Sequence, residues 1–341
     1  MKAARIHRWG GDLLLEDIPE PDLQDGEVLV EVAACGVGLT VLNYVRGDLG
    51  NDPNDLPRVP GHELVGTIVA VGPGVGPERE GELVAAFFYL FCGRCRHCLA
   101  GEEDVCEKLA GFLGVQRDGG YAERVSLPAR NAIRLPDNID PVLATVVNDA
   151  VATPVHVAGL ARLGPGQRVA VVAAGGGVGV HMVQVAQLFG AEVAGLDVTE
   201  EKLVYLEEEL GVIPIESSDF AKVTLPAAWH GKADVVVDLL GRPESLRWSL
   251  GALAGNGRLV ALTTFRDVAL PISPRELVLS QLAVLGSRYC TRAEFDLAAR
   301  LVAGGRVRPV IGRRERIAKL HEIHEDLRAG RLLGRGAVVW K

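Results

Sequence analysis

Four cysteines stand close together in the N-terminal third of the chain. They follow the pattern C-x2-C-x2-C-x7-C at Cys92, Cys95, Cys98 and Cys106. Four thiolates at this spacing can close a tetrahedron around zinc, and four protein ligands leave no position open for a substrate. We therefore predict one structural zinc ion per chain, in a lobe of about residues 91–108. An iron–sulfur cluster or four unligated thiols are the alternatives.

A second stretch combines glycines with an acid at a fixed distance. Residues 169–197 read VAVVAAGGGVGVHMVQVAQLFGAEVAGLD. This pattern predicts a buried strand, a glycine turn, a helix and a second strand that ends at Asp197. Such a turn lets a pyrophosphate approach the backbone, and the helix N-terminus offers it free N–H groups. The candidate cofactor-binding residues are Gly175, Gly176, Gly177, Val178, Gly179, Asp197, Lys202 and Thr153.

Asp197 favours one dinucleotide over the other. A carboxylate at the end of the second strand accepts hydrogen bonds from the ribose hydroxyls and would repel a 2′-phosphate, so we predict NAD(H) rather than NADP(H). One position departs from the fingerprint G-x-G-x-x-G, because its first glycine is Ala174. Alanine fits there if its φ angle stays negative. The alternative is an ordinary strand–helix–strand crossover with a flexible turn.

The surrounding pattern predicts an α/β protein with two kinds of architecture. Residues 1 to about 140 contain short strands broken by Pro and Gly, which indicates a β-rich, barrel-like domain. Residues 150–290 alternate strands and helices, as in a doubly wound parallel sheet. Further strands are expected at Val307–Ile311 and Ala337–Trp340, with a helix at Ile317–Leu327 between them. The expected N-terminal strands are Leu13–Ile18, Glu27–Ala34, Glu63–Val71 and Val84–Leu90.

Composition excludes several function classes. The chain has 341 residues and a formal net charge of −8, which argues against a nucleic-acid-binding protein. We expect no membrane span, because every window of membrane-spanning length contains polar groups. Clustered cysteines suit zinc binding in a reducing compartment. The expectation is a cytoplasmic protein that acts on a small molecule.

The glycine turn, the cysteine lobe and Gly61-His62-Glu63 together resemble the medium-chain dehydrogenase/reductase superfamily, in its zinc-type alcohol dehydrogenase branch. The resemblance covers nearly the whole chain, including Gly334-Arg335 before the last strand. It implies a GroES-like catalytic domain from residues 1–150 and 291–341, and a Rossmann NAD-binding domain at 151–290. It also implies an oxidoreductase that forms a homodimer or homotetramer.

The family's catalytic zinc is where the sequence departs from the resemblance. Its members bind that zinc through a Cys, the His of the GHE motif and a third acid or Cys. Here the positions hold Gly38, His62 and Asp149, and the earlier Cys35 is not the usual ligand. Two ligands are too few for a catalytic zinc, which normally has three. Either Glu63 or Cys35 replaces the thiolate, or His62 and Asp149 remain without metal. On this alignment, restoring a cysteine at position 38 is expected to create a second zinc site.

The family's proton path is changed as well. The resemblance implies that Thr40 supplies the hydroxyl that takes the substrate proton. The receiving position is Asn43, which cannot titrate. Tyr44 is a further candidate hydrogen-bond donor, although a packing role is the simpler interpretation. The candidate catalytic residues are therefore Thr40, His62, Asp149, Asn43 and Tyr44.

Without a Lewis acid, a carbonyl group is a harder target for hydride than a conjugated C=C bond. We therefore expect an enzyme that reduces an α,β-unsaturated carbonyl compound. The alternative is an alcohol dehydrogenase or ketone reductase with an atypical catalytic zinc, acting on an alicyclic compound. A protein that binds NAD without catalysis is the remaining alternative, and the conjunction of Thr40, His62 and Asp149 argues against it.

Overall fold

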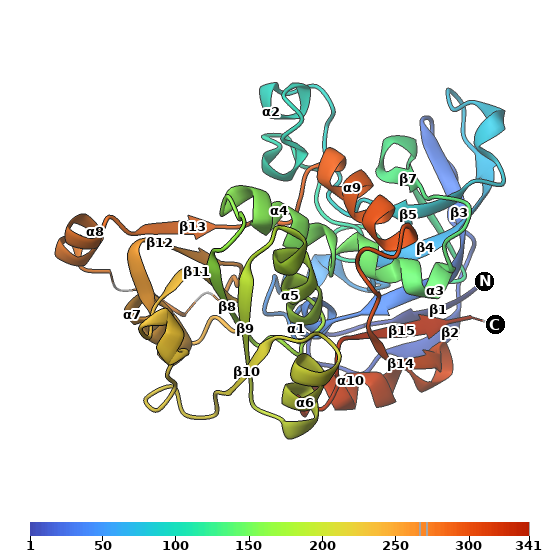
Figure 1. Cartoon of the computed structure of the whole chain (residues 1–341). Coiled ribbons are helices and arrows are strands. Elements are labelled where there is room, and N and C mark those ends of the chain that lie inside the picture. Colours follow the sequence, from blue (N-terminus) through green and yellow to red (C-terminus); the bar gives the residue numbers. More distant parts are fainter. Residues whose placement is uncertain (266, 271, 341) are drawn as a thin grey trace. The chain divides into compact units, whose positions relative to one another are not determined.

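The structure is a computed structural model that describes residues 1–265, 267–270 and 272–340. Its contacts divide the chain into two compact units. The N/C unit comprises Met1–Ala152 and Cys290–Lys341, and the central unit comprises Thr153–Tyr289. Figure 1 shows the β-sheets and helices of both units in sequence colours.

The N/C unit combines a two-stranded sheet, β1-β2, with a seven-stranded sheet. In the larger sheet the order is β14-β15-β3-β4-β5-β7, and β6 also pairs with β3. Its strands are β1 Lys2–Arg5, β2 Leu14–Asp17, β3 Glu27–Val37, β4 Glu63–Val71, β5 Leu83–Ala86, β6 Arg124–Pro128, β7 Ala132–Arg134, β14 Ile311–Arg316 and β15 Arg335–Val339. Its helices are α1 Leu39–Arg46, α2 Arg96–Leu99, α3 Pro141–Ala144, α9 Arg292–Ala303 and α10 Leu320–Arg328.

The core of the N/C unit follows from the alternation of its strands. β3 is buried along most of its length because sheet neighbours cover both edges and other elements cover its faces. Val28, Val30 and Val32 share one face of β3 and lie in the same apolar cluster as Leu64 and Ile68 of β4. This rigid pair of strands supports the residues that follow β3 and precede β4.

The central unit is a doubly wound sheet with strand order β10-β9-β8-β11-β12-β13, and its strand pairs are parallel. Chain order reverses between β8 and β11, and ligands of such sheets bind at the carboxyl ends of the strands beside that point. The predicted α/β fold class is thus confirmed. The strands are β8 Arg168–Val172, β9 Glu192–Asp197, β10 Ile213–Glu216, β11 Ala233–Asp238, β12 Leu253–Ala261 and β13 Ala283–Gly286. The helices are α4 Ala152–Leu160, which begins at the unit boundary, α5 Gly179–Leu188, α6 Glu200–Glu208, α7 Pro243–Gly251 and α8 Pro274–Ser280.

One predicted strand is misplaced. The sequence predicts a strand at Val307–Ile311, whereas the structure has β14 at Ile311–Arg316. Pro309 explains the difference, because proline has no N–H group to donate to a sheet ladder. The true strand carries four arginines or acids in six residues and lies at the sheet edge, where charged residues discourage pairing with another chain.

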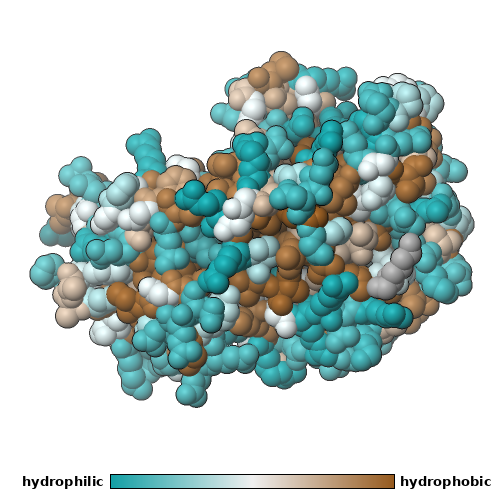
Figure 2. Space-filling model, turned by 45° about the vertical axis from the view of Figure 1, so that its right-hand side comes forward, coloured by the Kyte–Doolittle hydropathy of each residue, from teal (hydrophilic) through white to brown (hydrophobic). Residues whose placement is uncertain are grey.

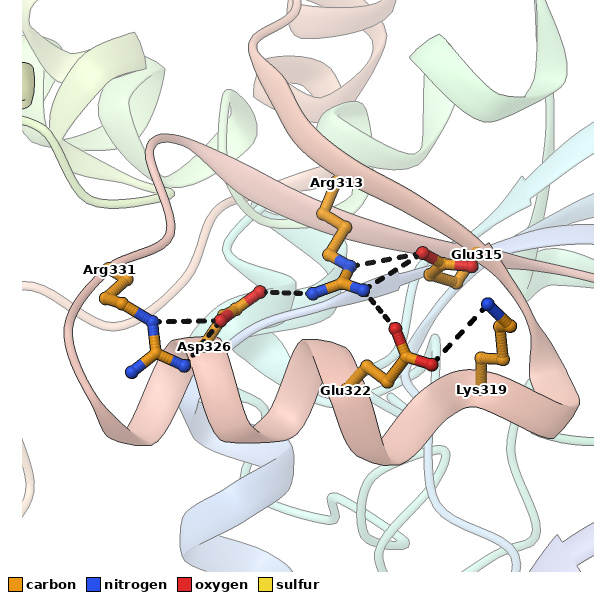
Figure 3. Close-up of polar contacts among 6 residues, drawn as sticks. All are labelled: Arg313, Glu315, Lys319, Glu322, Asp326 and Arg331. Atoms are coloured by element: carbon orange, nitrogen blue, oxygen red, sulfur yellow. Dashed lines mark hydrogen bonds and ion pairs between the residues drawn. The ribbon is translucent and has the colours of Figure 1, made fainter.

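Charged side chains join this edge strand to α10 (Figure 3). Arg313 of β14 pairs with Glu315 on its own strand and with Glu322 and Asp326 of α10, and Asp326 also accepts hydrogen bonds from Arg331. The hydrogen bond from Arg313, together with that from Arg331, lowers the pKa of the Asp326 carboxyl. The network therefore stabilises the packing of α10 against β14 at neutral pH.

This network predicts a dependence of stability on acid. Because the folded-state pKa of Asp326 is lowered, its contribution is present above its unfolded value of about 3.9 and is lost as the pH falls through the folded value. Replacing Arg313 by glutamine should remove that contribution, so the variant should melt earlier than wild type at pH 7 but lose less on acidification. Thermal melts from pH 7 to pH 3 at low salt test this, with Arg314→Gln on the same strand as the control. Equal losses in both variants would contradict a specific role for the network.

One helical segment, Pro141–Leu160, is long and apolar enough to cross a membrane by composition, but 78% of its apolar 18-residue window is buried inside the protein. Burial of this kind is typical of a core segment. Figure 2 shows polar and charged side chains across most of the visible surface, interspersed with small apolar patches.

Candidate active site and zinc lobe

The four clustered cysteines converge in the lobe that carries α2. Their sulfur atoms all lie within 4.8 Å of one another. The distances are 3.9 Å from Cys92 to Cys98, 3.5 Å from Cys95 to Cys98, and 3.9 Å from Cys95 to Cys106. Zinc–sulfur bonds of about 2.3 Å in a tetrahedron require sulfur–sulfur separations of about 3.8 Å. The lobe therefore fits a structural zinc ion without rearrangement.

Backbone groups prepare these sulfurs to act as thiolates. The N–H of Cys98 donates to Cys95 Sγ at 3.5 Å, and this hydrogen bond helps lower the pKa of Cys95 to about 6. The N–H groups of Arg94 and Cys95 point at Cys92 Sγ and lower its pKa as well. Burial instead raises the pKa of Cys98 to about 12, so zinc binding must displace a proton from that thiol.

The glycine turn of the central unit follows β8 and opens α5, as the sequence predicts. Gly179, the first residue of α5, packs closely on the turn. A Cβ there would overlap the carbonyl oxygen of Ala173 and lie 2.8 Å from Ala174 Cα. The left-handed residue of the turn is Ala173, with φ of 61°, whereas Ala174 is not among the residues with positive φ. Alanine is therefore tolerated at position 174 for the reason the sequence suggested.

Asp197 lies at the end of β9 and points back to this turn. Its Oδ2 accepts a hydrogen bond from the N–H of Gly175 at 2.8 Å, and its Oδ1 accepts one from Val198. Lys202 Nζ lies 3.9 Å from Asp197 Oδ1, and both side chains are buried. The structure thus brings the turn, Asp197 and Lys202 together, while Thr153 is buried at the start of α4. Turn and acid suit a dinucleotide; when bound, NAD(H) would supply or accept hydride.

The close approach at Gly179 gives a testable prediction. Replacing Gly179 by alanine should force the turn away from α5 and lower NAD⁺ affinity at least about tenfold, because overpacking a tight site costs about 1–3 kcal/mol. Gly251→Ala is the control, since Gly251 lies exposed at the end of α7 in the same unit, outside the turn, and nothing lies within 4 Å of its added Cβ. Titration of NAD⁺ by calorimetry measures both variants. A similar affinity in the two would show that the close packing is not required.

A third cluster forms in the N/C unit where three neighbouring strands meet. β3 runs antiparallel to both β4 and β15, with Gly36 opposite Glu63 on one side and Val37 opposite Gly336 on the other. The end of β3 therefore lies beside the beginnings of the other two strands. This register brings Gly38, Glu63 and Arg335 together where the end of β3 meets the starts of β4 and β15, although they are far apart in sequence.

Asp149 joins the cluster through the turn that precedes it. The buried amide of Asn148 donates to the carbonyl oxygens of Leu64 in β4 and Ala86 in β5, at 2.9 and 3.1 Å. This amide fixes the backbone just before Asp149 on the sheet. His62, Glu63 and Asp149 consequently offer ligand atoms that lie within 4.8 Å of one another.

Arg335 is the central cation of this cluster, and the sequence did not identify it as a site residue. Its Nε donates to Glu63 Oε2 at 2.9 Å, its Nη2 donates to Asp149 Oδ2 at 2.7 Å, and it also pairs with Glu63 Oε1. The guanidinium is 5% exposed and the Glu63 carboxylate is fully buried. The available signal was the Gly334-Arg335 pair at the start of the last strand, but spacing alone does not reveal its partners.

His62 lies against these charges with its ring tilted over Phe88, the ring centroids being 4.6 Å apart. Its Nε2 lies 3.4 Å from Glu63 Oε1 without a hydrogen bond and is buried. Burial lowers the pKa of His62, so the imidazole is neutral at pH 7. A neutral, desolvated ring nitrogen can either accept a proton or coordinate a metal.

The helix α1 carries the three remaining candidates, and they differ in their surroundings. Thr40 lies in its first turn and is partly exposed. Asn43 is partly exposed and accepts a hydrogen bond from Arg46 on the same helix. Tyr44 is buried beside Trp9, and its hydroxyl donates to the carbonyl of Val115 at 2.8 Å. These contacts match the packing role for Tyr44, so Thr40 is the α1 residue best suited to meet a substrate.

The cluster does not fit a catalytic zinc while Arg335 holds this position. A Cβ built on Gly38, where the family has its cysteine ligand, would lie 2.5 Å from Arg335 Cζ and 2.6 Å from both of its terminal nitrogens. The guanidinium thus fills the space of the missing thiolate and engages both carboxylates. His62 Nε2 has no hydrogen-bond partner among the described residues, whereas Glu63 and Asp149 both pair with Arg335, and a catalytic zinc needs three protein ligands.

Comparison with known proteins identifies the family. Residues 24–137 match the alcohol dehydrogenase GroES-like domain, and residues 177–304 match the zinc-binding dehydrogenase domain. The chain is 32% identical over 338 residues to an alcohol dehydrogenase of Geobacillus stearothermophilus, covering 98% of both chains. The chain belongs to the zinc-type alcohol dehydrogenase branch of the medium-chain dehydrogenase/reductase superfamily.

Solved structures agree with this assignment. A thermostable alcohol dehydrogenase from Pyrobaculum aerophilum with bound cobalt and zinc has a TM-score of 0.90 at 30% identity, with 99% of both chains covered. Acetophenone reductase from Geotrichum candidum in complex with NAD has a TM-score of 0.88 at 26% identity, covering 99% of this chain and 97% of that one. This member of the dehydrogenase family is therefore an NAD-dependent oxidoreductase with a structural-zinc lobe and a small-molecule substrate.

Proposed function

We propose that this dehydrogenase transfers hydride between NAD(H) and the conjugated C=C bond of a small α,β-unsaturated carbonyl compound, without a catalytic zinc ion. One observation carries the proposal: the Arg335 guanidinium pairs with Glu63 and Asp149 and fills the space beside Gly38. We also propose that the N/C unit supplies the catalytic residues and the central unit holds the cofactor.

The chemistry of such a reduction suits the groups that are present. Hydride addition to the β-carbon moves negative charge onto the carbonyl oxygen, and hydrogen-bond donors can stabilise the resulting enolate. The Thr40 hydroxyl and the neutral His62 ring are the candidate donors, and Arg335 supplies a fixed positive charge in the cluster that contains His62. An unconjugated ketone would develop a full alkoxide, which normally requires a Lewis acid.

Metal content together with a substrate panel tests the proposal. The purified enzyme should hold one zinc per chain by plasma mass spectrometry. It should oxidise NADH with 2-cyclohexenone faster than with cyclohexanone, and it should leave cyclohexanol unchanged in the presence of NAD⁺. Two zinc ions per chain, with alcohol oxidation and no turnover of enones, would overturn it.

The second candidate is an alcohol dehydrogenase with an atypical zinc bound by His62, Glu63 and Asp149. It is favoured by the mutual distances below 4.8 Å of their ligand atoms, and it requires Arg335 to withdraw from both carboxylates. In either case we propose a cytoplasmic location, since thiols remain reduced and free to bind zinc in that compartment. We also propose a homodimer or homotetramer, as the family resemblance implies.

A further inference from the structure

A basic cavity of about 420 Å³ lies elsewhere in the N/C unit, with no lining residue in common with the cluster around Arg335. It opens between α9 and the segment that leads into β7, which lie beside each other in Figure 1. Four guanidinium groups and two carboxylates line it, which gives the wall a formal charge of +2. The charged residues are Arg79, Arg130, Arg134, Arg292, Glu82 and Asp296.

Two of these arginines are held in place by the fold. Arg79 donates to Glu82 at 2.8 Å and to the carbonyl oxygens of Ala129 and Ala132, so all of its nitrogens have acceptors. Arg130 donates from Nε to the carbonyl of Phe91, and its guanidinium carbon lies 5.9 Å from the centre of the Phe91 ring. Arg79 therefore has a structural role in the wall, whereas the terminal nitrogens of Arg130 have no hydrogen-bond partner among the described residues.

Arg292, at the start of α9, is the unexplained member. Its Nε is buried and has no hydrogen-bond partner among the described residues. No ion pair joins its guanidinium to a carboxylate in the described chain, although Asp296 lines the same cavity one helical turn away. A desolvated N–H of a charged group without an acceptor is costly, so its retention indicates an acceptor that comes from outside the chain.

We propose that this cavity binds a phosphate group, either as inorganic phosphate or on a small metabolite. A tetrahedral dianion can accept hydrogen bonds from several guanidiniums that approach from different directions, whereas one carboxylate is satisfied by a single bidentate arginine. These arginines come from three elements: Arg130 lies in the turn before β7, Arg134 ends β7 and Arg292 begins α9. The site is independent of the proposed reaction and of the cofactor.

The position of the cavity links it to the zinc lobe. Arg130 holds the carbonyl of Phe91, the residue before Cys92, and the backbone N–H of Arg292 donates at 3.1 Å to Glu103, which lies between Cys98 and Cys106. A phosphate bound to both arginines would therefore brace the lobe against α9. We expect it to slow the release of zinc to a chelator.

The test uses the zinc-loaded enzyme with saturating NAD⁺, so that the phosphate site of the cofactor is filled. Calorimetric titration with inorganic phosphate, with glycerol 3-phosphate and with acetate distinguishes free phosphate, a phosphate ester and a simple carboxylate. We expect binding of one or both phosphates and not of acetate. Arg292→Gln should weaken it about tenfold, as loss of a charged hydrogen bond implies.

Two further variants keep the result interpretable. Arg134→Gln should weaken phosphate binding to a smaller extent, and because Arg134 is largely exposed its loss should leave the fold intact. Arg306→Gln, which removes one exposed charge beyond the other end of α9, should change nothing. Three results would each overturn the proposal: no phosphate binding to wild type, wild-type affinity in both Arg292→Gln and Arg134→Gln, or a loss of affinity in Arg306→Gln as large as that in Arg292→Gln.

Discussion

Replacing Arg335 by glutamine is expected to lower the free energy of unfolding of the N/C unit by about 3–5 kcal/mol, the usual cost of leaving a buried charge without its partner. Glu63 is fully buried and Asp149 is 15% exposed, and both carboxylates pair with this guanidinium. Glutamine keeps much of the side-chain volume, so the loss reports on charge rather than on a cavity. The shift in the urea midpoint, followed by near-UV circular dichroism, measures it.

The same variant should respond to pH in a defined direction. Without the guanidinium, ionisation of the two carboxylates disfavours the folded state, so the deficit should be largest at neutral pH and should shrink as acid protonates them. Arg314→Gln, an exposed arginine on the neighbouring strand β14, is the control and should stay within about 0.5 kcal/mol of wild type. A deficit that is independent of pH would mean that Arg335 contributes through packing instead.

The parts of the molecule that sequence predicted are those encoded locally. The zinc lobe depends on four cysteines within one short loop, and the nucleotide unit depends on a strand, a glycine turn and a helix in direct succession. Their chemistry is visible because each set is adjacent in the chain. The strand predicted at Glu63–Val71 has the observed bounds for a similar reason, since a run of apolar and β-branched residues begins and ends there.

The parts that sequence did not predict depend on contacts between distant residues. The strand expected at Val84–Leu90 stops at Ala86, because the amide of Asn131 takes the carbonyl oxygens of Phe87 and Tyr89. Helix α1 was not predicted from its β-branched residues, although Gly47 in the left-handed conformation ends it in the usual way. A single side chain from another part of the chain decides such boundaries.

Arg335 shows this limit most clearly. It lies 272 positions from Glu63, and only the antiparallel register of β15, β3 and β4 brings the two together. Two glycines make room for the pair, Gly36 in β3 and Gly38 just after it. A Cβ at Gly36 would overlap the Glu63 carboxylate, and one at Gly38 would meet the Arg335 guanidinium. The absence of a cysteine at position 38 was visible in the sequence, but the group that replaces it was not.

This arrangement changes what is expected of a restored cysteine. Sequence alone predicts that Gly38→Cys creates a second zinc site with His62 and Asp149. In the structure the new side chain would meet Arg335, which is held by both carboxylates, so the single variant should still bind one zinc per chain and should be less stable. Combining Gly38→Cys with Arg335→Ala removes the obstacle and frees Asp149. The double variant should hold two zinc ions per chain, because three protein ligands then surround one position.

Plasma mass spectrometry after dialysis against a weak chelator measures the stoichiometry. Gly38→Cys, Arg335→Ala and the double variant form a complete cycle with wild type. Arg335→Ala alone offers only His62, Glu63 and Asp149 as ligands. Because this set lacks a thiolate, dialysis should remove a second zinc from Arg335→Ala before it removes one from the double variant. A cysteine at the exposed, unobstructed position of Gly251 controls for adventitious metal on a new thiol. Two zinc ions in Gly38→Cys alone would show that Arg335 yields to the metal, and the zinc-dependent alternative would then replace the metal-free reaction.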